Sequence, residues 1–504
     1  MKLIKNRWNT PAVLLLALSL GSCESFLEKE PLDNFSADNY YTQDATSATE
    51  AVLGIYNAFY RDGWYKRNMW LAQEIGSDNG YISGPHPFND LNVTPGNGEI
   101  TDIWRNHYDL INRAQHVLVK VPNAKMDDTE KEKLLGEAQF LESLAYFNLV
   151  RYYGGVPIIK DIPTAENAFS LVRNTEAEVY EHIIKSLETA IQRLPTTQGT
   201  ANAGRVTKGA AQTLLADVYL TLASRQNNNA YYQKVVELTG EVINSGVYKM
   251  ETDYANNFYP TTENGIESIF EIQYTNVWER GGQEFQWWAT YGGGWGELRV
   301  TDNLVNAYKA NNVTLPDGTV LMDVRGDVTV LEKGEKMKNN SYVNTTGQPR
   351  PQKYVDFDDP AKYTFFLNSA QNTKVYRYSE VLLMRAEALN KLGQPGAVEL
   401  INTIRRRAFK LPLTEMNALT DIPASVSSSE LDRIILNERR LEFALESKRW
   451  FDLIRTGKTA EVLNQASNVE GGPTRVVEER DLLFPIPQAQ VNLYPTWELN
   501  PANY

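Results

Sequence analysis

One cysteine and four histidines are the residues from which nucleophilic catalysis would have to be built. The histidines are His86, His107, His116 and His182, and the cysteine is Cys23. A catalytic cysteine needs a nearby base that favours its thiolate, and none of these histidines lies in a recognisable cysteine-hydrolase context. One thiol also excludes an intrachain disulfide and a thiolate metal site. The composition therefore argues against sulfur chemistry.

Common catalytic motifs do not occur elsewhere in the chain. His-Glu-x-x-His, Gly-x-Ser-x-Gly, a phosphate-binding Gly-Lys-Ser/Thr loop and a dinucleotide fingerprint are all absent from the sequence. Its 63 acidic residues supply carboxylate pairs for glycoside hydrolysis many times over, so they do not discriminate. Asp356, Asp358 and Asp359 offer a calcium site, but without EF-hand spacing a solvated turn explains them better. We therefore expect no enzyme, no metal and no cofactor.

The residues best suited to binding are aromatic and lie in a glycine-rich stretch. In "TNVWERGGQEFQWWATYGGGWGEL", four of the ten tryptophans fall within eighteen residues and six glycines interrupt them. A sugar ring stacks its apolar C–H face on an aromatic ring, while its hydroxyls bond to polar side chains. We predict that ligand is contacted by Trp287, Trp288, Tyr291 and Trp295. The alternative is that these rings only fasten the loop to the fold.

A second loop, residues 77–99, reads "SDNGYISGPHPFNDLNVTPGNGE" and mixes aromatic with polar side chains. Such a mixture suits hydroxyl binding, since a few placed polar groups orient a ligand that apolar surface holds. We predict that Tyr81, Phe88, Asn89 and Asp90 complete the ligand site.

The charged segment 437–455, "NERRLEFALESKRWFDLIR", has the composition of an active site but is better explained as structure. Surface pairs at helical spacing contribute only about 0.2–0.5 kcal/mol each. We interpret the segment as a structural network of pairs along one helix: Arg439 with Glu442, Glu446 with Arg449, Lys448 or Arg449 with Asp452, and Asp452 with Arg455.

The N-terminus suggests a different role for the cysteine. Basic residues at positions 2, 5 and 7 precede an apolar segment, residues 11–20, that is too short to span a bilayer. These features predict a signal peptide. The sequence Leu-Gly-Ser-Cys at residues 20–23 resembles the lipobox of bacterial lipoproteins. This resemblance implies that Cys23 becomes the first residue and carries acyl chains, each methylene contributing roughly 0.8 kcal/mol to membrane binding. The alternative is an ordinary signal peptide with an incidental cysteine.

Composition also restricts the partners of the mature chain. Acidic residues outnumber basic ones 63 to 50, and no basic run follows the signal peptide. Phosphate binding needs clustered Lys and Arg, so we expect no nucleic-acid partner. No mature stretch contains 18 consecutive apolar residues, so the lipid would be the sole membrane attachment.

Helical periodicity dominates the rest of the chain. Apolar residues recur at i, i+3 and i+4 over 48–59, with Ser47 and Glu50 at capping-box spacing. Residues 102–121 and 130–153 predict a helical hairpin, ended by proline and glycine.

Two later segments, 206–246 and 374–409, predict tetratricopeptide-like helix pairs, because small inner-face residues alternate with large ones a turn away. A third helical block, 427–457, begins with serines suited to an N-cap and ends at Gly457.

Residues 250–373 differ from this helical frame. They are rich in Asn, Gly, Thr and aromatics, and "SIFEIQY" predicts a strand at 268–274. Binding residues concentrate in loops that a rigid scaffold carries. We therefore predict a signal peptide (1–22), an extended tether arm (23–45) and a single domain (46–504), with a helical frame (46–249 and 374–460), a loop-rich ligand-binding insertion (250–373) and a C-terminal extended segment (461–504).

Several long strings carry a family resemblance over nearly the whole mature chain. Together with the lipobox, they resemble motifs of the SusD/RagB family of Bacteroidetes outer-membrane lipoproteins, in the family's order. The strings are "RYYGGVPII" (151–159), "YRYSEVLLMRAEALNKLG" (376–393), "ILNERRLEFALESKRWFDLIRTG" (435–457) and "LLFPIPQAQVNLYPTWELNPANY" (482–504).

The resemblance implies a mainly α fold, in which tetratricopeptide-like helix pairs form a right-handed superhelical frame that carries an irregular insertion with short strands. It implies a lipid-anchored protein of the outer membrane that faces the cell exterior and partners a SusC-like TonB-dependent transporter. Residues 78–104 and 274–300 resemble the ligand-bearing regions of the family. A structural role is implied for the signature residues Glu438, Arg439, Glu442, Arg449 and Asp452.

We therefore expect a non-enzymatic lipoprotein that captures oligosaccharide or polysaccharide and delivers it to the transporter. One alternative keeps the fold and the partner but binds peptide, as some relatives do. A second alternative is a glycoside hydrolase that degrades its ligand.

Overall fold

The computed structural model describes residues 41–42, 44–164, 168–277, 280–282, 287–290, 294–339, 342–355, 369–464 and 475–500. The predicted signal peptide, Cys23 and most of the tether arm lie outside the described residues. So do Tyr291 and the three aspartates considered for calcium. Within the described ranges, every helix is too short or too polar to cross a membrane.

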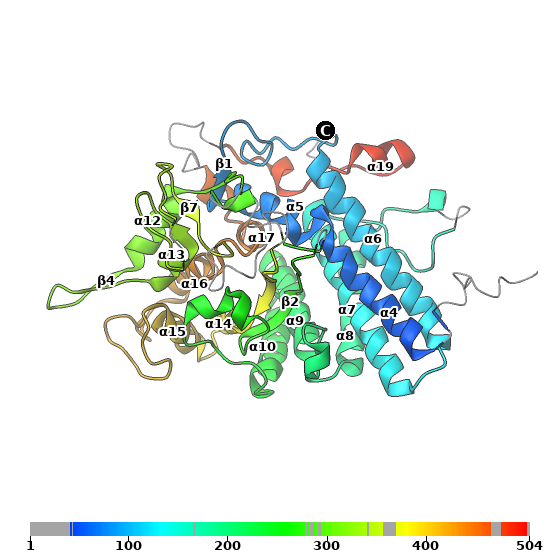
Figure 1. Cartoon of the computed structure of the whole chain (residues 1–504), viewed down its shortest axis with the longest axis horizontal. Coiled ribbons are helices and arrows are strands. Elements are labelled where there is room, and N and C mark those ends of the chain that lie inside the picture. The colour runs from blue at the N-terminus through cyan, green and yellow to red at the C-terminus, as the bar shows by residue number, and fades with distance from the viewer. Residues whose placement is uncertain are drawn as a thin grey trace, which may run out of the picture.

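A stack of antiparallel helices forms the frame of the molecule (Figure 1). In the first half, each helix packs on the next from α6 to α10, and α4 packs on α6 and α7. The predicted hairpin and the 206–246 pair are both confirmed. These helices are α4 (Ala45–Tyr56), α6 (Gly98–Lys120), α7 (Asp128–Tyr153), α8 (Glu176–Arg193), α9 (Lys208–Gln226) and α10 (Asn229–Asn244).

The stack continues after the insertion, because α10 packs on α14, which in turn packs on α15 and α16. The tetratricopeptide-like frame is therefore built from two separate parts of the chain. Its second half consists of α14 (Tyr378–Lys391), α15 (Ala397–Ala408) and α16 (Ser428–Phe443), followed by the shorter α17 (Arg449–Arg455), α18 (Thr459–Leu463) and α19 (Gln488–Leu493).

Helix starts follow local capping chemistry. The side chain of Asp44, rather than that of Ser47, caps α4 by accepting a hydrogen bond from Ser47 N at 2.8 Å. Ser427 caps α16 as predicted, accepting from Glu430 N at 3.3 Å. The predicted capping box at Ser47 is therefore wrong, because Asp44 provides a closer cap one turn earlier.

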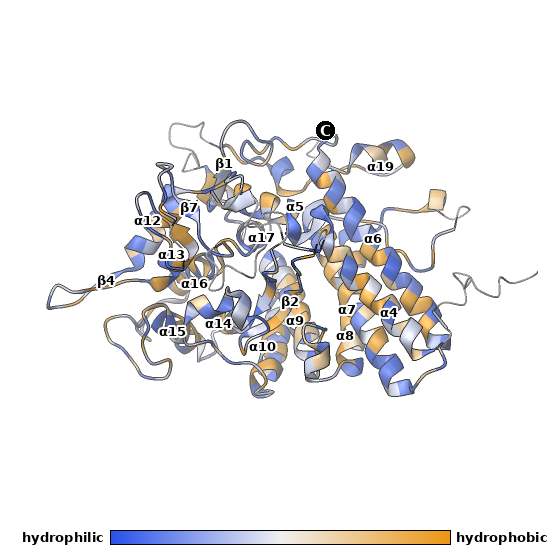
Figure 2. Cartoon of the chain, viewed as in Figure 1, coloured by the Kyte–Doolittle hydropathy of each residue, from blue (hydrophilic) through white to orange (hydrophobic). Residues whose placement is uncertain are grey.

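The core lies between the helices of this frame. α7 and α9 are buried on nearly all sides, and residues such as Leu141, Phe147 and Leu214 have no exposed surface. In Figure 2 hydrophilic and hydrophobic turns alternate along α4 and α6, which cover this core. Burying each large apolar side chain contributes roughly 1.5–3 kcal/mol to the free energy of folding. The tightly packed helices therefore form a stable support for the loops.

Among the described residues, the strands form four two-stranded antiparallel sheets. The predicted strand at 268–274 is confirmed as β2 (Ser268–Ile272), which pairs with β8 (Thr373–Arg377). The prediction that residues 374–377 begin a helix is wrong, because their pairing with β2 in the core outweighs helical periodicity. The other pairs are β1 (Gly80–Ile82) with β3 (Leu298–Val300), β4 (Val313–Thr314) with β5 (Val320–Leu321), and β6 (Val330–Leu331) with β7 (Arg350–Pro351).

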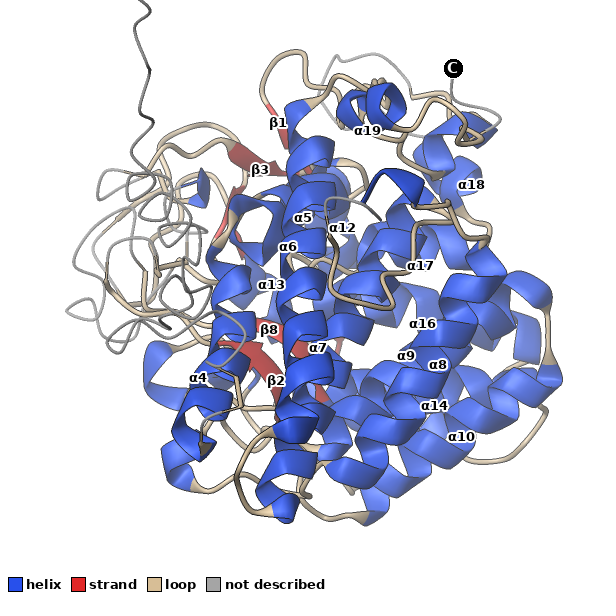
Figure 3. Ribbon diagram, turned by 90° about the vertical axis from the view of Figure 1, so that its right-hand side faces the viewer, coloured by secondary structure: helices blue, strands red, loops and turns tan. Residues whose placement is uncertain are grey.

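Short elements connect the frame to the loops, and Figure 3 shows β1 and β3 at the same end of the molecule as α5. The short α-helices are α5 (Asn68–Trp70), α12 (Asp302–Asn311) and α13 (Val324–Thr329). The 3-10 and π segments are η1 (Asn57–Tyr60), η2 (Asp62–Lys66), η3 (Leu71–Ile75), η4 (Val121–Asn123), η5 (Ala168–Ser170), η6 (Thr200–Asn202), η7 (Tyr254–Asn257), η8 (Pro260–Thr262) and η10 (Glu479–Leu482).

The charged segment 437–455 is not one helix on the surface. α16 ends at Phe443, and Leu445 and Ser447 adopt left-handed φ angles of 66° and 59° before α17 begins. The buried carboxylate of Glu74 holds this break by accepting hydrogen bonds from Leu445 N (3.3 Å) and Ser447 N (2.7 Å). Burial raises the pKa of Glu74 to about 7.

Most of the predicted pairs along this segment are wrong. The break between α16 and α17 changes the direction of the chain, so the side chains pair with residues that are not one helical turn away. Arg439 pairs with Asp452 at 2.8 Å, Arg449 with Asp78 at 2.8 Å and Glu446 with Arg377 at 2.8 Å. Of the predicted pairs, that of Asp452 with Arg455 is present, at 2.9 Å. These side chains are buried, so the segment is structural, but as part of the core.

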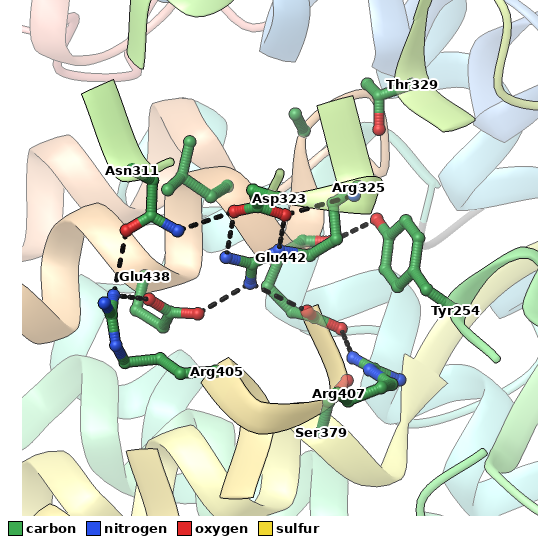
Figure 4. Close-up of polar contacts among 12 residues, drawn as sticks. Tyr254, Asn311, Asp323, Arg325, Thr329, Ser379, Arg405, Arg407, Glu438 and Glu442 are labelled. Carbon is green, nitrogen blue, oxygen red and sulfur yellow. Dashed lines mark hydrogen bonds and ion pairs between the residues drawn. The ribbon is translucent and has the colours of Figure 1, made fainter. Parts of the chain in front are cut away.

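Glu442 lies at the centre of a buried charge network (Figure 4). Its carboxylate accepts hydrogen bonds from Arg377 at 2.9 Å, from Arg325 at 3.1 Å and from Arg407. The network joins five cations with five carboxylates, so its formal charge is balanced. Its members are Arg325, Lys353, Arg377, Arg405, Arg407, Glu267, Asp323, Glu438, Glu442 and Glu446.

Candidate ligand-binding site

Trp287 and Trp295 form a partly exposed aromatic pair. Their ring centroids lie 4.5 Å apart with planes at 90°, and Trp295 keeps 52% of its surface exposed. Glu297 N donates to Trp287 O at 2.7 Å, which closes the loop that carries both rings. Gly296 has φ +60°, and a Cβ there would lie 2.5 Å from Thr290 Cγ2. Glycine is therefore required where the chain turns after Trp295.

The guanidinium group of Arg67 packs against the face of Trp287. Arg67 lies 4.3 Å from the centroid of the Trp287 ring, and its Nη1 donates to Asn68 Oδ1 at 2.8 Å. The Glu99 carboxylate is 3.7 Å from the same guanidinium. Burial raises the pKa of Glu297, and Arg67 partly offsets this effect. The aromatic pair is therefore bordered by one cation and two carboxylates, all able to bond hydroxyls.

Trp288 lies in the core rather than beside its neighbour. It is 1% exposed, and its indole packs edge-on against Trp70 with centroids 5.5 Å apart. Tyr354 contacts its other side at 6.0 Å. Each of the two interpretations of the aromatic loop therefore applies to a different tryptophan: Trp288 fastens the loop to the fold, while Trp295 faces solvent.

The predicted residues of the 77–99 loop are also mostly internal. Tyr81 and Phe88 are 4% and 2% exposed, and Tyr81 Oη donates to Gln348 Oε1 at 3.0 Å. Asn89 shapes the loop by donating to Ile82 O at 2.7 Å and to Gly84 O at 3.1 Å. Asp90 is exposed and accepts from His86 N at 3.3 Å. Of these four, Asp90 alone presents its side chain openly.

The β1–β3 pair brings the two predicted loops together. Tyr81 in β1 lies opposite Arg299 in β3, so the 77–99 loop and the aromatic loop leave the same short sheet. Sequence reasoning missed the third contributor, residues 61–75, which supplies Arg67 and Trp70. The only signal there was the mixture of basic and aromatic residues in "RDGWYKRNMW".

One of the four histidines, His107, serves packing rather than acid–base chemistry. His107 is fully buried and stacks on Trp64 with ring centroids 3.6 Å apart. Its Nδ1 lies 2.7 Å from Ile103 O, and burial lowers its pKa to about 3. A neutral, stacked imidazole of this kind is a packing residue. Over the described ranges, His, Cys, Asp and Glu side chains form no group of three or more suited to a metal ion.

Family models match both halves of the chain. The SusD family matches residues 252–502, and a family described as starch-binding and associating with outer membrane matches residues 25–220. SusD-like protein P38 of Formosa agariphila is 28% identical over 511 residues, covering 96% of this chain and 97% of that protein. A SusD-like protein of Bacteroides ovatus is 26% identical, covering 88% and 81%.

Solved structures share the fold. A SusD-like carbohydrate binding protein from Bacteroides fragilis superposes with a TM-score of 0.78 at 23% identity, covering 91% of this chain and 100% of that one. A laminarin binding SusD-like protein superposes with a TM-score of 0.73 at 24% identity, covering 91% and 99%. The expected mainly α, tetratricopeptide-like fold with a stranded insertion is confirmed. By its helical frame, its sequence motifs and these matches, the chain belongs to the SusD/RagB family.

Proposed function

We propose that this protein captures oligosaccharide or polysaccharide at the cell surface and delivers it, unaltered, to a SusC-like TonB-dependent transporter. The observation that carries this proposal is the partly exposed Trp287–Trp295 pair on a loop of the helical frame. The family description as starch-binding and the carbohydrate-binding names of structural neighbours support the glycan class.

Recognition would combine stacking with hydroxyl bonding. The exposed face of Trp295 is available to the C–H face of a sugar, since such contact removes apolar surface from water on both partners. Arg67, Glu99 and Glu297 border the ring pair and would orient hydroxyls. Because Trp288, Tyr81, Phe88 and Asn89 are buried, we assign them support of these loops and leave Trp287, Trp295 and Asp90 as the proposed contacts.

A binding panel tests the function. The protein without its signal peptide is titrated with malto-, laminari-, xylo- and acidic oligosaccharides and with a peptide library, and each mixture is then analysed for products. We expect saturable binding of at least one saccharide and no change in its length. Binding of peptides alone would favour the peptide-binding alternative, and new shorter products would identify a hydrolase instead.

Attachment to the outer membrane is a further part of the proposal and rests on the lipobox-like sequence at Cys23. Two or more acyl chains hold a protein stably on a bilayer, whereas one holds it marginally.

The tether is tested by fatty-acid labelling of the full chain in its host. We expect Cys23→Ala to abolish labelling, while the purified variant binds saccharide as before. Labelling that persists in the variant would contradict the assignment.

The transporter partner is tested by purifying the wild-type chain from the same membranes. We expect a SusC-like transporter to co-purify with it.

A further inference from the structure

A charged cleft lies between α6 and the segment 57–66. It has a volume of about 710 Å³, and its polar lining comes from η1, η2, α6 and Arg280. Figure 1 shows α4 alongside α6, with α5 near the upper end of α4, and η1, η2 and α6 contact one another. The lining residues are Asn57, Tyr60, Arg61, Asp62, Lys66, Asp102, Arg105, Asn106, Asp109, Arg113 and Arg280.

The cleft carries excess positive charge. Five of its lining residues are basic and three are acidic, although the whole chain has a net charge of −13. Two of the carboxylates are neutralised by neighbours on α6, since Asp102 pairs with Arg105 at 2.7 Å and Asp109 with Arg113 at 3.0 Å. A positive cleft in an acidic protein attracts anions selectively, because the surrounding charge repels them elsewhere.

Two of the remaining cations have no carboxylate partner. Arg61 and Arg280 are exposed, and within the described part of the chain neither makes an ion pair. Lys66 Nζ donates to Tyr60 O at 3.3 Å. Burial raises the pKa of Tyr60, and the positive charge of Arg280 partly offsets this rise. Arg61, Lys66 and Arg280 therefore place positive charge in the lining of the same cleft.

Two segments of the chain run from the cleft to the proposed sugar contacts. Lys66 lines the cleft, and the next residue, Arg67, lies under Trp287. On α6, Glu99 faces Arg67, and Asp102 follows three residues later, a rise of about 4.5 Å along the same helix face. The nearest lining residue of the cleft on α6, Asp102, is therefore within one helical turn of Glu99.

We propose that this cleft is an anion subsite, which selects saccharides bearing carboxylate or sulfate groups next to the unit that stacks on the tryptophans. The inference rests on the proposed function and adds the substrate class. Carboxylates of uronic acids and sulfate esters share the chemistry that guanidinium groups recognise, namely paired anionic oxygens.

The test compares charged saccharides with their uncharged derivatives by calorimetry. The probes are oligogalacturonates and their methyl esters, κ-carrageenan oligosaccharides and their desulfated forms, and neutral laminari- and malto-oligosaccharides. We expect the tightest ligand to be anionic and to bind about tenfold more tightly than its uncharged derivative at low salt. The difference should shrink as salt rises, since the Debye length falls from about 10 Å at 0.1 M to about 3 Å at 1 M.

Variants locate the effect in the cleft. In R61Q/R280Q, affinity for the charged ligand should fall to that of its uncharged derivative, while binding of the uncharged derivative is retained. R433Q removes an exposed arginine from α16 and is the matched control, which should leave both affinities unchanged. Comparison with the methyl esters tests recognition of the carboxylate, and comparison with the desulfated oligosaccharides tests recognition of the sulfate.

The outcomes separate this inference from the proposed function. A neutral saccharide as tightest ligand, or a charge preference that survives in R61Q/R280Q, overturns the anion subsite and leaves glycan capture standing. Failure of every saccharide to bind overturns both.

Discussion

Replacing Glu442 with glutamine is expected to lower the melting temperature by about 3–5 °C, which corresponds to a loss of roughly 3–5 kcal/mol of stability in a chain of this length. Glu442 is fully buried, and its carboxylate bonds to Arg325, Arg377 and Arg407. Glutamine keeps the shape but removes the charge, which leaves one uncompensated positive charge among three buried guanidiniums. Removing one partner of a buried pair costs more than the pair contributes, because the remaining charge stays desolvated.

The matched control is the same substitution on the same helix. Glu430 lies in the first turn of α16, pairs with Arg433 at 2.5 Å, and both side chains are largely exposed. Solvent screens an exposed ion pair, so Glu430→Gln should leave the melting temperature within about 1 °C of wild type. Equal melting temperatures for the two variants would contradict the central role of Glu442.

The same variant has a defined pH dependence. Burial favours the protonated acid, but Arg407, Arg377 and Arg325 together hold the pKa of Glu442 well below its usual range. Its stabilising contribution is therefore complete above the unfolded pKa of about 4.3 and is lost as the pH falls below that value. The difference in melting temperature between wild type and E442Q should narrow on acidification from about pH 7 to about pH 3.

Replacing Trp295 with alanine is expected to weaken binding of the saccharide identified by the panel by about 10- to 100-fold. Trp295 exposes 52% of its surface beside Trp287. Covering a large apolar side chain with ligand contributes roughly 1.5–3 kcal/mol, and each 1.4 kcal/mol is about tenfold in affinity. Calorimetry measures the loss. The melting temperature should barely change, because exposed side chains contribute little to stability.

Trp287→Ala should have a similar effect on affinity, since Trp287 holds Trp295 edge-on and covers Arg67. Phe169→Ala is the control: Phe169 is a 69% exposed aromatic on η5, outside the two ligand loops, and its removal should not alter affinity. Unchanged affinity in both tryptophan variants would exclude this aromatic pair as the binding surface.

The helical frame was largely predictable because its signals are local. Apolar residues at i, i+3 and i+4 define each helix within one or two turns, and caps such as Ser427 act over three residues. The 176–193 helix also has a local signal, because Thr175 and Glu178 form a complete capping box at its start.

The errors occurred where distant segments compete with local preference. Residues 374–377 form a strand because β2, about a hundred residues earlier, pairs with them in the core. The charged segment breaks after α16 because Glu74 accepts backbone hydrogen bonds from the break. Neither partner is visible in a short sequence window, so tertiary contacts decided both outcomes.

The helical class, the order of the frame helices, the family and the region that carries the aromatic residues all follow from local sequence patterns. Only the tertiary structure decided which of these rings face solvent. Trp287 and Trp288 are adjacent in sequence, yet Trp288 is buried because Trp70 and Tyr354 enclose it. Exposure depends on the sum of contacts from all segments that meet at a site, and those contacts exist only once the frame has brought the segments together.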